Sequence, residues 1–339
     1  MMRLSESLRR NIMEVTISGI LNKFKIRSRR SVLFFEDILV NYIKCCEKHG
    51  FSKELESVTR HWATLAFWLL TPNYVKNFGS TLLVEITKKI WKNLGLIKDA
   101  TVIRRDNILS IKTNNEFITR TIGKNSFMVG FYMGCINAIY KKEAKPIKVL
   151  QTKNSCDYEY ELGDKLVNLK NLGRKDYYKL NYLLEGGKLT LKSAVKNKIF
   201  SLGRDNSLYF RERRILIIEN TLFHLIGNEN LLFEKTQDIS YNFFKQVIEK
   251  HSTDNEKLNL LKNLLQIMGW GIVTILSYKN KIIIKVKNPP FGLQLEGDNW
   301  NFLANVVLGY LHVLNKGFKI ENINNANSTN KNLLLTYSI

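Results

Sequence analysis

The sequence predicts an α+β fold made of two repeated units, each with helices packed on one face of a small antiparallel sheet. Two observations carry this prediction. An apolar segment with an internal glycine occurs twice, as FMVGFYMGCINAIY at 127–140 and as FLANVVLGYLHVLN at 302–315. The stretches before these segments also match, because IWKNLGLIKDATVIRRDNILSIKTNNEF at 90–117 can be laid over LLQIMGWGIVTILSYKNKIIIKVKNPPF at 264–291.

The spacing between the two copies is nearly constant. It is 174 residues in the first part of the match (269−95) and 175 in the second (309−134). A constant spacing over about 45 residues indicates an internal repeat rather than chance similarity. The matched pairs are Gly95 with Gly269, Asn114 with Asn288, Phe117 with Phe291, Phe127 with Phe302, and Gly134 with Gly309.

Each copy is expected to begin with amphipathic helices. Leucines and isoleucines recur three and four positions apart in STLLVEITKKIWKNLG at 80–95 and in NEKLNLLKNLLQIMG at 255–269, and a glycine ends both segments. Further helices are expected before each of these. They span 31–48 and 55–70 in the first copy, and 214–226 and 230–250 in the second.

Short strands are expected after these helices. β-Branched residues dominate ATVIRR and ILSIKT in the first copy and GIVTILSY and KIIIKVK in the second, with RDN or KN as the turn. After the glycine-containing helix, KPIKVLQTKN and CDYEYEL close the first copy, and GFKIENIN and NLLLTYSI close the second. The resulting order is helix, helix, strand, strand, helix, strand, strand, which predicts an antiparallel sheet with one face to cover.

The repeat divides the chain into four parts. A basic amphipathic segment is expected at 1–30, the first unit at 31–163, a basic connector at 164–204 and the second unit at 205–339. The 339 residues carry 52 Lys and Arg against 30 Asp and Glu, a net charge of +22. This balance suits contact with nucleic acid or an anionic membrane, or it reflects a generally lysine-rich proteome.

The pattern resembles the 4-vinyl-reductase-like domain, whose superfamily also holds the small subunits of the TRAPP vesicle-tethering particle. The resemblance is carried by the helix ends LG at 94–95 and MG at 268–269, the strand leading into KNPPF at 287–291, the two glycine-containing helices, and CDYEYEL at 156–162. It covers roughly 31–163 and 205–339. The resemblance implies a tandem ligand-binding or protein-docking module that holds a small hydrophobic molecule or an acyl chain between helices and sheet, and that regulates or tethers.

No catalytic constellation is evident, so the protein is expected to be non-enzymatic, with no cofactor and no metal. Some members of the family place two cysteines near the last strands as metal ligands, but Cys156 has no partner in its loop and LLLTYSI has no cysteine. The five histidines show no metal-binding spacing. Cys135 is interpreted as a packed small residue, with a pocket-lining or acyl-accepting thiol as the alternative.

The location is expected to be cytoplasmic. No apolar run reaches the 18 or so residues of a membrane-spanning helix, so no transmembrane segment is expected. The first residues, MMRLSESLRRNIMEV, carry charges where a signal peptide has a continuous apolar region.

The leading hypothesis is a sensor, adaptor or regulatory protein whose hydrophobic cleft takes a small hydrophobic ligand or a protein partner. A homodimer is compatible with it. Glycines at 130, 134 and 309 are expected to let the central helix of each unit approach its neighbour closely. The candidate residues for lining the ligand pocket, or the core beside it, are Phe127, Phe131, Cys135, Phe302 and Val306.

The alternative hypothesis is a nucleic-acid-associated protein that binds phosphates through its basic N-terminus and connector. The same charges suit an anionic membrane surface, or a helix that packs its apolar stripe and leaves its arginines in solvent. The candidate residues for either anionic surface are Arg9, Arg10, Arg27, Arg29, Arg30, Arg174, Lys175, Arg211, Arg213 and Arg214.

Overall fold

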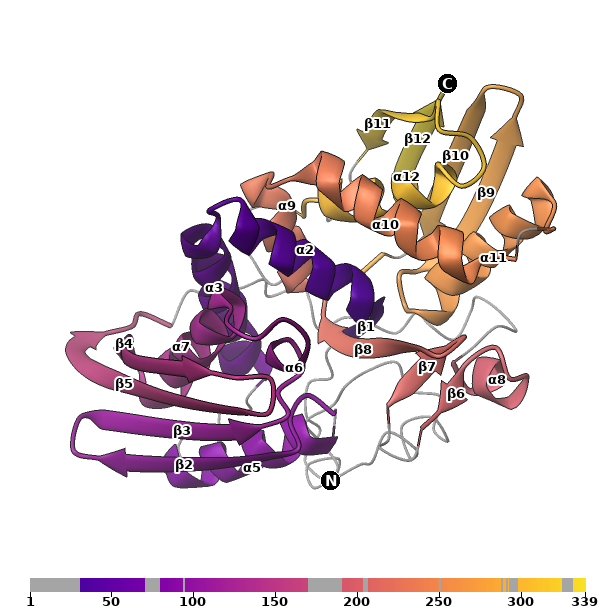
Figure 1. Ribbon diagram of the computed structural model, residues 1–339. Helices are drawn as coiled ribbons and strands as arrows, with labels where there is room; N and C mark the ends of the chain where they lie inside the picture. Colours follow the sequence, from indigo (N-terminus) through magenta and orange to yellow (C-terminus); the bar gives the residue numbers. More distant parts are fainter. Residues whose placement is uncertain are drawn as a thin grey trace.

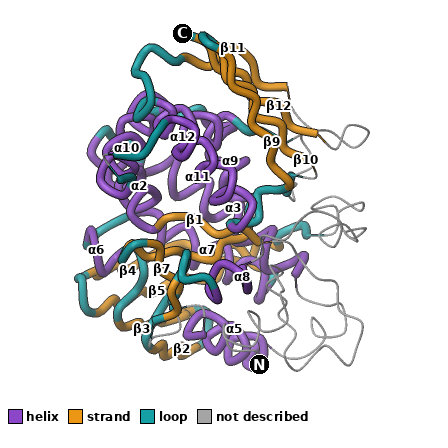
Figure 2. Tube along the Cα trace, turned by 90° about the vertical axis from the view of Figure 1, so that its right-hand side faces the viewer, coloured by secondary structure: helices purple, strands orange, loops and turns teal. Residues whose placement is uncertain are grey.

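The described residues of the computed structural model form three four-stranded antiparallel sheets with helices packed among them (Figure 1). Two sheets with matching strand arrangements lie at opposite ends of the molecule, and the third sheet lies between them (Figures 1 and 2). The architecture is therefore α+β, as predicted. The residues described are 31–70, 80–93, 95–169, 191–203, 207–249, 251–287, 289–290, 292, 298–324 and 332–339.

The first unit contains one four-stranded sheet with the strand order β2-β3-β5-β4. Its central helix α7 starts where the side chain of Asn125 accepts a hydrogen bond from the backbone N–H of Met128, a typical N-cap. The elements are β1 (Ser31–Phe35), α2 (Glu36–Lys48), α3 (Ser52–Leu70), α5 (Ser80–Asn93), β2 (Asp99–Arg105), β3 (Ile108–Asn114), α6 (Thr119–Ile122), α7 (Ser126–Tyr140), β4 (Lys142–Gln151) and β5 (Ser155–Leu166).

Apart from the one-turn helix α6, the second unit repeats this order in its described residues, with the sheet β9-β10-β12-β11. Its elements are β8 (Arg213–Glu219), α9 (Thr221–Glu229), α10 (Phe233–Val247), α11 (Asp254–Ile267), β9 (Ile272–Tyr278), β10 (Lys281–Lys287), α12 (Asn301–Leu311), β11 (Lys319–Asn324) and β12 (Asn332–Ser338). Between the units lie α8 (Leu191–Lys196), β6 (Ser201–Leu202) and β7 (Leu208–Phe210). The two units thus share one topology.

The predicted start positions of two helices are wrong. Residues 31–35 and 213–219 form the strands β1 and β8, and the helices start only at Glu36 and Thr221. All five residues of β1 are buried, and β8 is apolar from Ile215 to Ile218. Such a run shows no alternation that separates a strand from a buried helix, so periodicity alone could not assign it.

The two missed strands pair with each other. β1 and β8 run antiparallel, with Ser31 opposite Glu219, Leu33 opposite Ile217 and Phe35 opposite Ile215. β1 and β8 hold the same place in their units, and the pairing is antiparallel. An approximate two-fold axis therefore passes through its centre, as in an isologous dimer interface.

The first strand and first helix of each unit pack against the other unit. α2 packs along α10, and α9 packs along α3. The backbone N–H of Leu33 donates to the carbonyl of Met268 at 2.8 Å, and the indole of Trp62 donates to Glu219 at 3.1 Å. The ring of Phe34 contacts three aromatic side chains of the second unit, Phe223, Trp270 and Phe302. The two units therefore share one continuous core.

The glycines of the two central helices make the close contacts expected from sequence. A Cβ added to Gly134 would overlap the carbonyl oxygen of Arg60 and lie 2.7 Å from the Cβ of Ala63. A Cβ added to Gly309 would overlap the carbonyl of Gln237 and lie 2.5 Å from the Cβ of Ser240. The helix pairs α3–α7 and α10–α12 are therefore built around the same glycine contact.

The strand pairing changes one detail of the sequence match. Ile108 and Lys281 open the second strand of their hairpins, opposite Arg105 and Tyr278, so the copies are 173 residues apart here (281−108). Asn114 therefore corresponds to Lys287 rather than to Asn288. The second unit has one residue fewer between the glycine that ends its helix and its first strand, which accounts for the shift.

Candidate binding site at the β7–β8 turn

The five side chains expected to line a ligand pocket lie in the packed core. Phe127, Phe131 and Cys135 are on α7 and Phe302 and Val306 on α12, all less than a tenth exposed. The structure does not bring the two groups to one site. Phe127 packs on Trp62 and Phe117 in the first unit. Phe302 packs on Phe223 of the second unit and on Phe34 and Tyr42, which β1 and α2 of the first unit place against it.

Cys135 and Cys156 are buried rather than activated. Burial raises the pKa of the Cys135 thiol well above its ordinary value. The pKa of Cys156 is raised to about 11 by burial and, secondly, by the charge of Glu116. A nucleophilic cysteine needs a lowered pKa, so neither thiol is set up for covalent chemistry.

Three of the ten basic candidates lie in the described part of the chain, and each is engaged by protein groups. Arg211 Nη2 lies 2.7 Å from Glu249, and Arg213 Nη1 lies 3.2 Å from Asp37. Arg214 Nε lies 3.3 Å from Glu36. These arginines tie β8 to α2 and to the residues after α10. The candidates outside the described residues are Arg9, Arg10, Arg27, Arg29, Arg30, Arg174 and Lys175.

The turn between β7 and β8 is the first element of the candidate site. Arg211 and Glu212 form its tip and have φ angles of +46° and +66°. Two successive left-handed residues are typical of a tight hairpin turn, where glycine or asparagine is usual. Two charged side chains therefore occupy positions that cost backbone strain, and such strain concentrates at functional sites.

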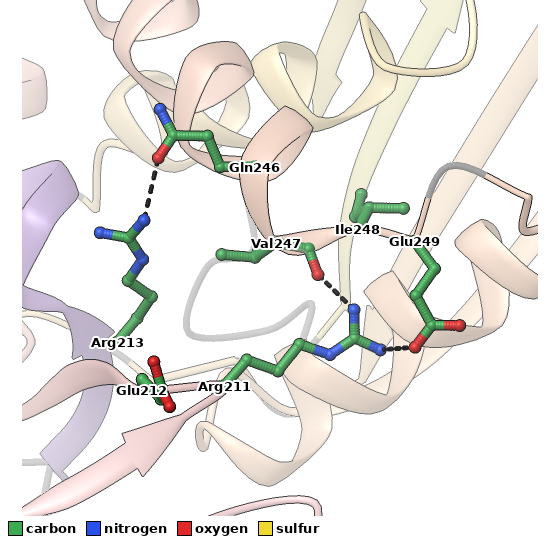
Figure 3. Close-up of a pocket in the computed structure, with 7 residues that line it drawn as sticks. All are labelled: Arg211, Glu212, Arg213, Gln246, Val247, Ile248 and Glu249. Atoms are coloured by element: carbon green, nitrogen blue, oxygen red, sulfur yellow. Dashed lines mark hydrogen bonds and ion pairs between the residues drawn. The ribbon is translucent and has the colours of Figure 1, made fainter.

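A polar pocket of about 530 Å³ opens on one side of this turn (Figure 3). Arg211 and Arg213 reach from the turn toward the end of α10 at two sides of the opening. Arg211 donates to the carbonyl of Val247 and to Glu249, and Arg213 donates to the side chain of Gln246 at 3.0 Å. The remaining wall is made by Glu212 and Ile248.

A second, apolar cleft of about 490 Å³ is lined by the same two turn residues, Arg211 and Glu212, and by α11. Leu260, Leu264 and Ile267 line it from α11, where their spacing of four and three residues puts them on one helix face. Phe210 and Ile199 complete the apolar wall. The polar groups of the cleft are Lys198, Ser201, Arg211, Glu212 and Asn263. Its volume is in the range of small-molecule sites, which combine an apolar lining with a few polar groups.

A second polar cluster is fully buried in the first unit. The carboxylate of Glu116 accepts hydrogen bonds from Tyr132 at 2.6 Å, Tyr158 at 2.8 Å, Thr113 at 2.9 Å, and Thr119. Tyr158 itself receives a hydrogen bond from Gln151, and Thr119 receives one from Asn125, so both hydroxyls direct their hydrogen to Glu116. The carboxylate is saturated by protein donors and has no opening for a ligand.

His224 and His312 also have structural partners. His224 is 1% exposed and bonds the carbonyls of Asn299 and Pro290 at 2.8 and 3.1 Å. His312 bonds the carbonyl of Phe318. Within the described ranges, no three His, Cys, Asp or Glu side chains are grouped as metal ligands. The same residues include no helix with the length and apolar character needed to cross a bilayer.

Sequence reasoning missed this site because it placed 214–226 in a helix. A signal was present, since RERR at 211–214 separates the apolar strands LYF and ILII, a pattern typical of a charged hairpin turn. The contribution of α11 could not be found in the same way. In the sequence, the leucines of α11 have the spacing of ordinary core residues. Their position beside the turn is visible only in the folded structure.

Comparisons of this sequence with protein-family models and with curated proteins find no match.

Proposed function

We propose that the protein is a non-enzymatic binding protein whose ligand is a small molecule with an apolar body and an anionic head. The apolar cleft between α11 and the β7–β8 turn is the proposed site. Its volume of about 490 Å³ and its floor of Phe210, Leu264 and Ile267 are the observation that carries the proposal. The resemblance to ligand-binding and docking modules agrees with it.

The polar groups of the cleft suggest the charge of the ligand. Lys198 and Arg211 are the cationic groups of the cleft, and Glu212 is its anionic group. Arg211 is already paired with Glu249, which leaves Lys198 as the group for an anionic head. The apolar body would lie along Leu260 and Leu264. Burial of that body would provide most of the affinity, because apolar surface removed from water is the dominant favourable contribution.

The site would link ligand binding to the junction between the units. Arg211 and Glu212 line both pockets, and Arg213 beside them pairs with Asp37 of α2. A ligand that orders this turn would thereby act on the strand that pairs with β1. This arrangement suits a sensor or adaptor, in which occupancy of one site changes a distant surface.

The proposal is tested with the fluorescent probe anilinonaphthalene sulfonate, which has an aromatic body and an anionic head, and with dodecanoate as a competitor. Asn263→Trp fills the cleft and is expected to weaken probe binding at least tenfold. Lys198→Glu is expected to weaken it by a similar factor. Asn259→Trp is the matched control, since Asn259 is an exposed residue of α11 that does not line the cleft.

Two results would overturn the proposal. One is that the intact protein does not bind the probe. The other is that Asn263→Trp and Asn259→Trp bind it equally well. Circular dichroism melting of each variant verifies that the fold is retained, so that lost binding is not lost structure.

A further inference from the structure

Among the residues that the structure describes, no helix packs on one face of the second unit's sheet. Figure 2 shows α10, α11 and α12 on one side of β9, β10 and β12. The inward residues of β10 are Ile282, Ile284 and Val286, each no more than 2% exposed. Alternate residues of a strand point to opposite faces, so Lys281, Ile283, Lys285 and Lys287 belong to the outer face.

The outer face is basic and carries an exposed aromatic ring. On β9, Tyr278 is 57% exposed and Leu276 is 46% exposed, opposite Lys281 and Ile283 of β10. Lys285 and Lys287 are exposed and have no carboxylate partner among the described residues. Lys281 is paired with Glu321 at 2.8 Å. We define the basic face as Leu276, Tyr278, Lys281, Ile283, Lys285, Lys287 and Lys319.

The matching sheet of the first unit has a different charge pattern. Its strand β5 places Asp157, Glu159 and Glu161 on the outer face, and Lys148 pairs with the first two at 3.1 and 3.3 Å. The same places on β12 are held by Leu334, Thr336 and Ser338, as the pairing of each strand with its neighbour shows. The second sheet therefore keeps its lysines but lacks the three carboxylates of the central strand, and among the described residues Glu321 of β11 pairs with Lys281 alone.

We propose that the basic face of the second unit binds single-stranded nucleic acid. Lys285 and Lys287 lie two residues apart on one strand, about 7 Å along it, so they can contact different phosphates of one extended chain. Tyr278 lies on the same face opposite Lys281, farther along the sheet from these two lysines, and offers a ring on which a base can stack. A positive surface combined with an exposed aromatic ring is the arrangement that binds single strands without sequence preference. This face lies apart from the arginines of the β7–β8 turn, which are engaged by protein groups.

Alternative anionic partners fit the same face less well. An anionic membrane attracts lysines but gains from apolar side chains that insert, whereas Leu276 is 46% exposed and Ile283 is partly buried in the sheet surface. An acidic protein segment matches the charge but makes no use of the ring of Tyr278. Duplex nucleic acid keeps its bases stacked inside, so it too would leave the ring unused.

The test uses the 339-residue chain and a labelled oligouridylate of about 12 nucleotides, long enough for a site of the usual size. Binding is followed by fluorescence anisotropy at about 50 and 200 mM salt. The double variant Lys285→Glu/Lys287→Glu is expected to weaken binding at least tenfold at the lower salt concentration. It is also expected to reduce the steepness of the salt dependence, because fewer phosphates are neutralised.

The first unit provides the matched control. Lys112 holds on β3 the place that Lys285 holds on β10, and its cross-strand neighbour on β5 is Asp157. Lys112→Glu is expected to change the affinity less than twofold. Tyr278→Ala is expected to weaken binding about tenfold and Tyr278→Phe to leave it unchanged, because stacking needs the ring and not the hydroxyl.

Several results would overturn the proposal. Absence of binding at low salt would do so, and so would an affinity that the Lys285→Glu/Lys287→Glu and Tyr278→Ala variants leave unchanged, since the nucleic acid would then bind elsewhere. Equal binding of poly-glutamate or of phosphatidylserine vesicles would show a surface that selects charge alone. Equal binding of a duplex of the same length would exclude stacking on Tyr278.

Discussion

Arg214 of β8 reaches across the boundary between the two units to Glu36, the first residue of α2, with 3.3 Å between its Nε and Oε2 of Glu36. Arg120 binds the same carboxylate through both of its oxygens, at 2.6 and 2.7 Å. Arg120 and Arg214 also donate to the carbonyl of Gly95. The side chain of Glu36 is only 7% exposed. This one buried carboxylate therefore links Arg120 of the first unit to Arg214 of the second.

Replacing this carboxylate is expected to destabilise the whole protein. Glu36→Gln leaves two largely buried guanidinium groups without their counter-charge, and breaking a buried ion pair on one side typically costs about 3–5 kcal/mol. Urea denaturation followed by circular dichroism measures the change in the free energy of unfolding. Glu85→Gln is the control, because Glu85 forms an exposed i,i+3 pair with Lys88 and should cost less than about 1 kcal/mol. Equal losses in the two variants would contradict the role of Glu36.

The glycines of the central helices are expected to be equally sensitive in both units. Gly134→Ala and Gly309→Ala each force a methyl group against the backbone of the neighbouring helix, and overpacking of this kind costs about 1–3 kcal/mol. Gly163→Ala is the control, since its Cβ would meet the nearest atom, the carbonyl oxygen of Glu143, at 3.5 Å. Thermal unfolding measures all three. A loss in only one of the two helix variants would refute the structural equivalence of the units.

The buried cluster around Glu116 is expected to depend on the carboxylate itself. Glu116→Gln presents an N–H group to hydroxyls that already point their hydrogens at this position, so at least about 2 kcal/mol should be lost. Tyr337→Phe serves for comparison, because it removes one hydrogen bond, to the carbonyl of Ala304 at 3.0 Å, and should cost about 1 kcal/mol. Chemical denaturation measures the loss in the free energy of unfolding for both variants. A larger loss for Tyr337→Phe than for Glu116→Gln would exclude a special role of the Glu116 carboxylate.

The protein is expected to lose stability in alkali. Burial raises the pKa of Tyr132, Tyr158, Tyr160 and Tyr337 above the usual 10, and raises that of Cys156 to about 11. These groups keep their protons in the folded state at a pH where the unfolded chain has lost them. The unfolded state therefore binds fewer protons, and the free energy of unfolding falls as the pH rises above about 9.

Melting temperatures at pH 8 and at about pH 10.5 measure this effect. For the buried tyrosines, the absorbance of the ionised side chain should rise together with unfolding and not before it. Tyr278→Phe is the control, because Tyr278 is 57% exposed and should leave the alkaline loss unchanged. A melting temperature that stays constant over this range would show that the buried hydroxyls ionise freely in the folded state.

Elements with a clear period or a clear turn could be predicted from the sequence. The helices 80–93 and 254–267 follow from their leucine spacing, and the hairpins β2–β3 and β9–β10 from β-branched runs around a short polar turn. The close approach at Gly134 and Gly309 follows from two small residues in a bulky apolar helix. In each case the determining interaction lies within a few residues of the chain.

The junction between the units could not be predicted because its determinants are far apart in the chain. SVLFF at 31–35 forms a strand through its hydrogen bonds to 215–219, and neither segment shows this pairing on its own. The same holds for Glu116, whose donors come from β3, α6, α7 and β5. The second unit has Val307 and Leu335 where the first has Tyr132 and Tyr158, so even the internal repeat gave no sign of this cluster.

The candidate binding site could be predicted only in part. Apolar residues with helical spacing on α11 and a charged turn at 211–214 are both visible in the sequence. Their meeting depends on the connector, because Lys198, Ile199 and Ser201 close the cleft from a segment with no counterpart in the repeat. Phe127 and Phe302, which match in the two copies of the repeat and were expected to line a pocket, are packed in the core instead.

The antiparallel pairing of β1 with β8 places two copies of one topology in the relation of a symmetric dimer, but within a single polypeptide. In a dimer of identical chains every substitution is made twice, so an acidic strand on one outer sheet is an acidic strand on both. Here Asp157, Glu159 and Glu161 can stand on one sheet while Leu334, Thr336 and Ser338 stand on the other. Joining the halves covalently lets the two ends of the molecule acquire separate tasks without disturbing the contact that holds them together.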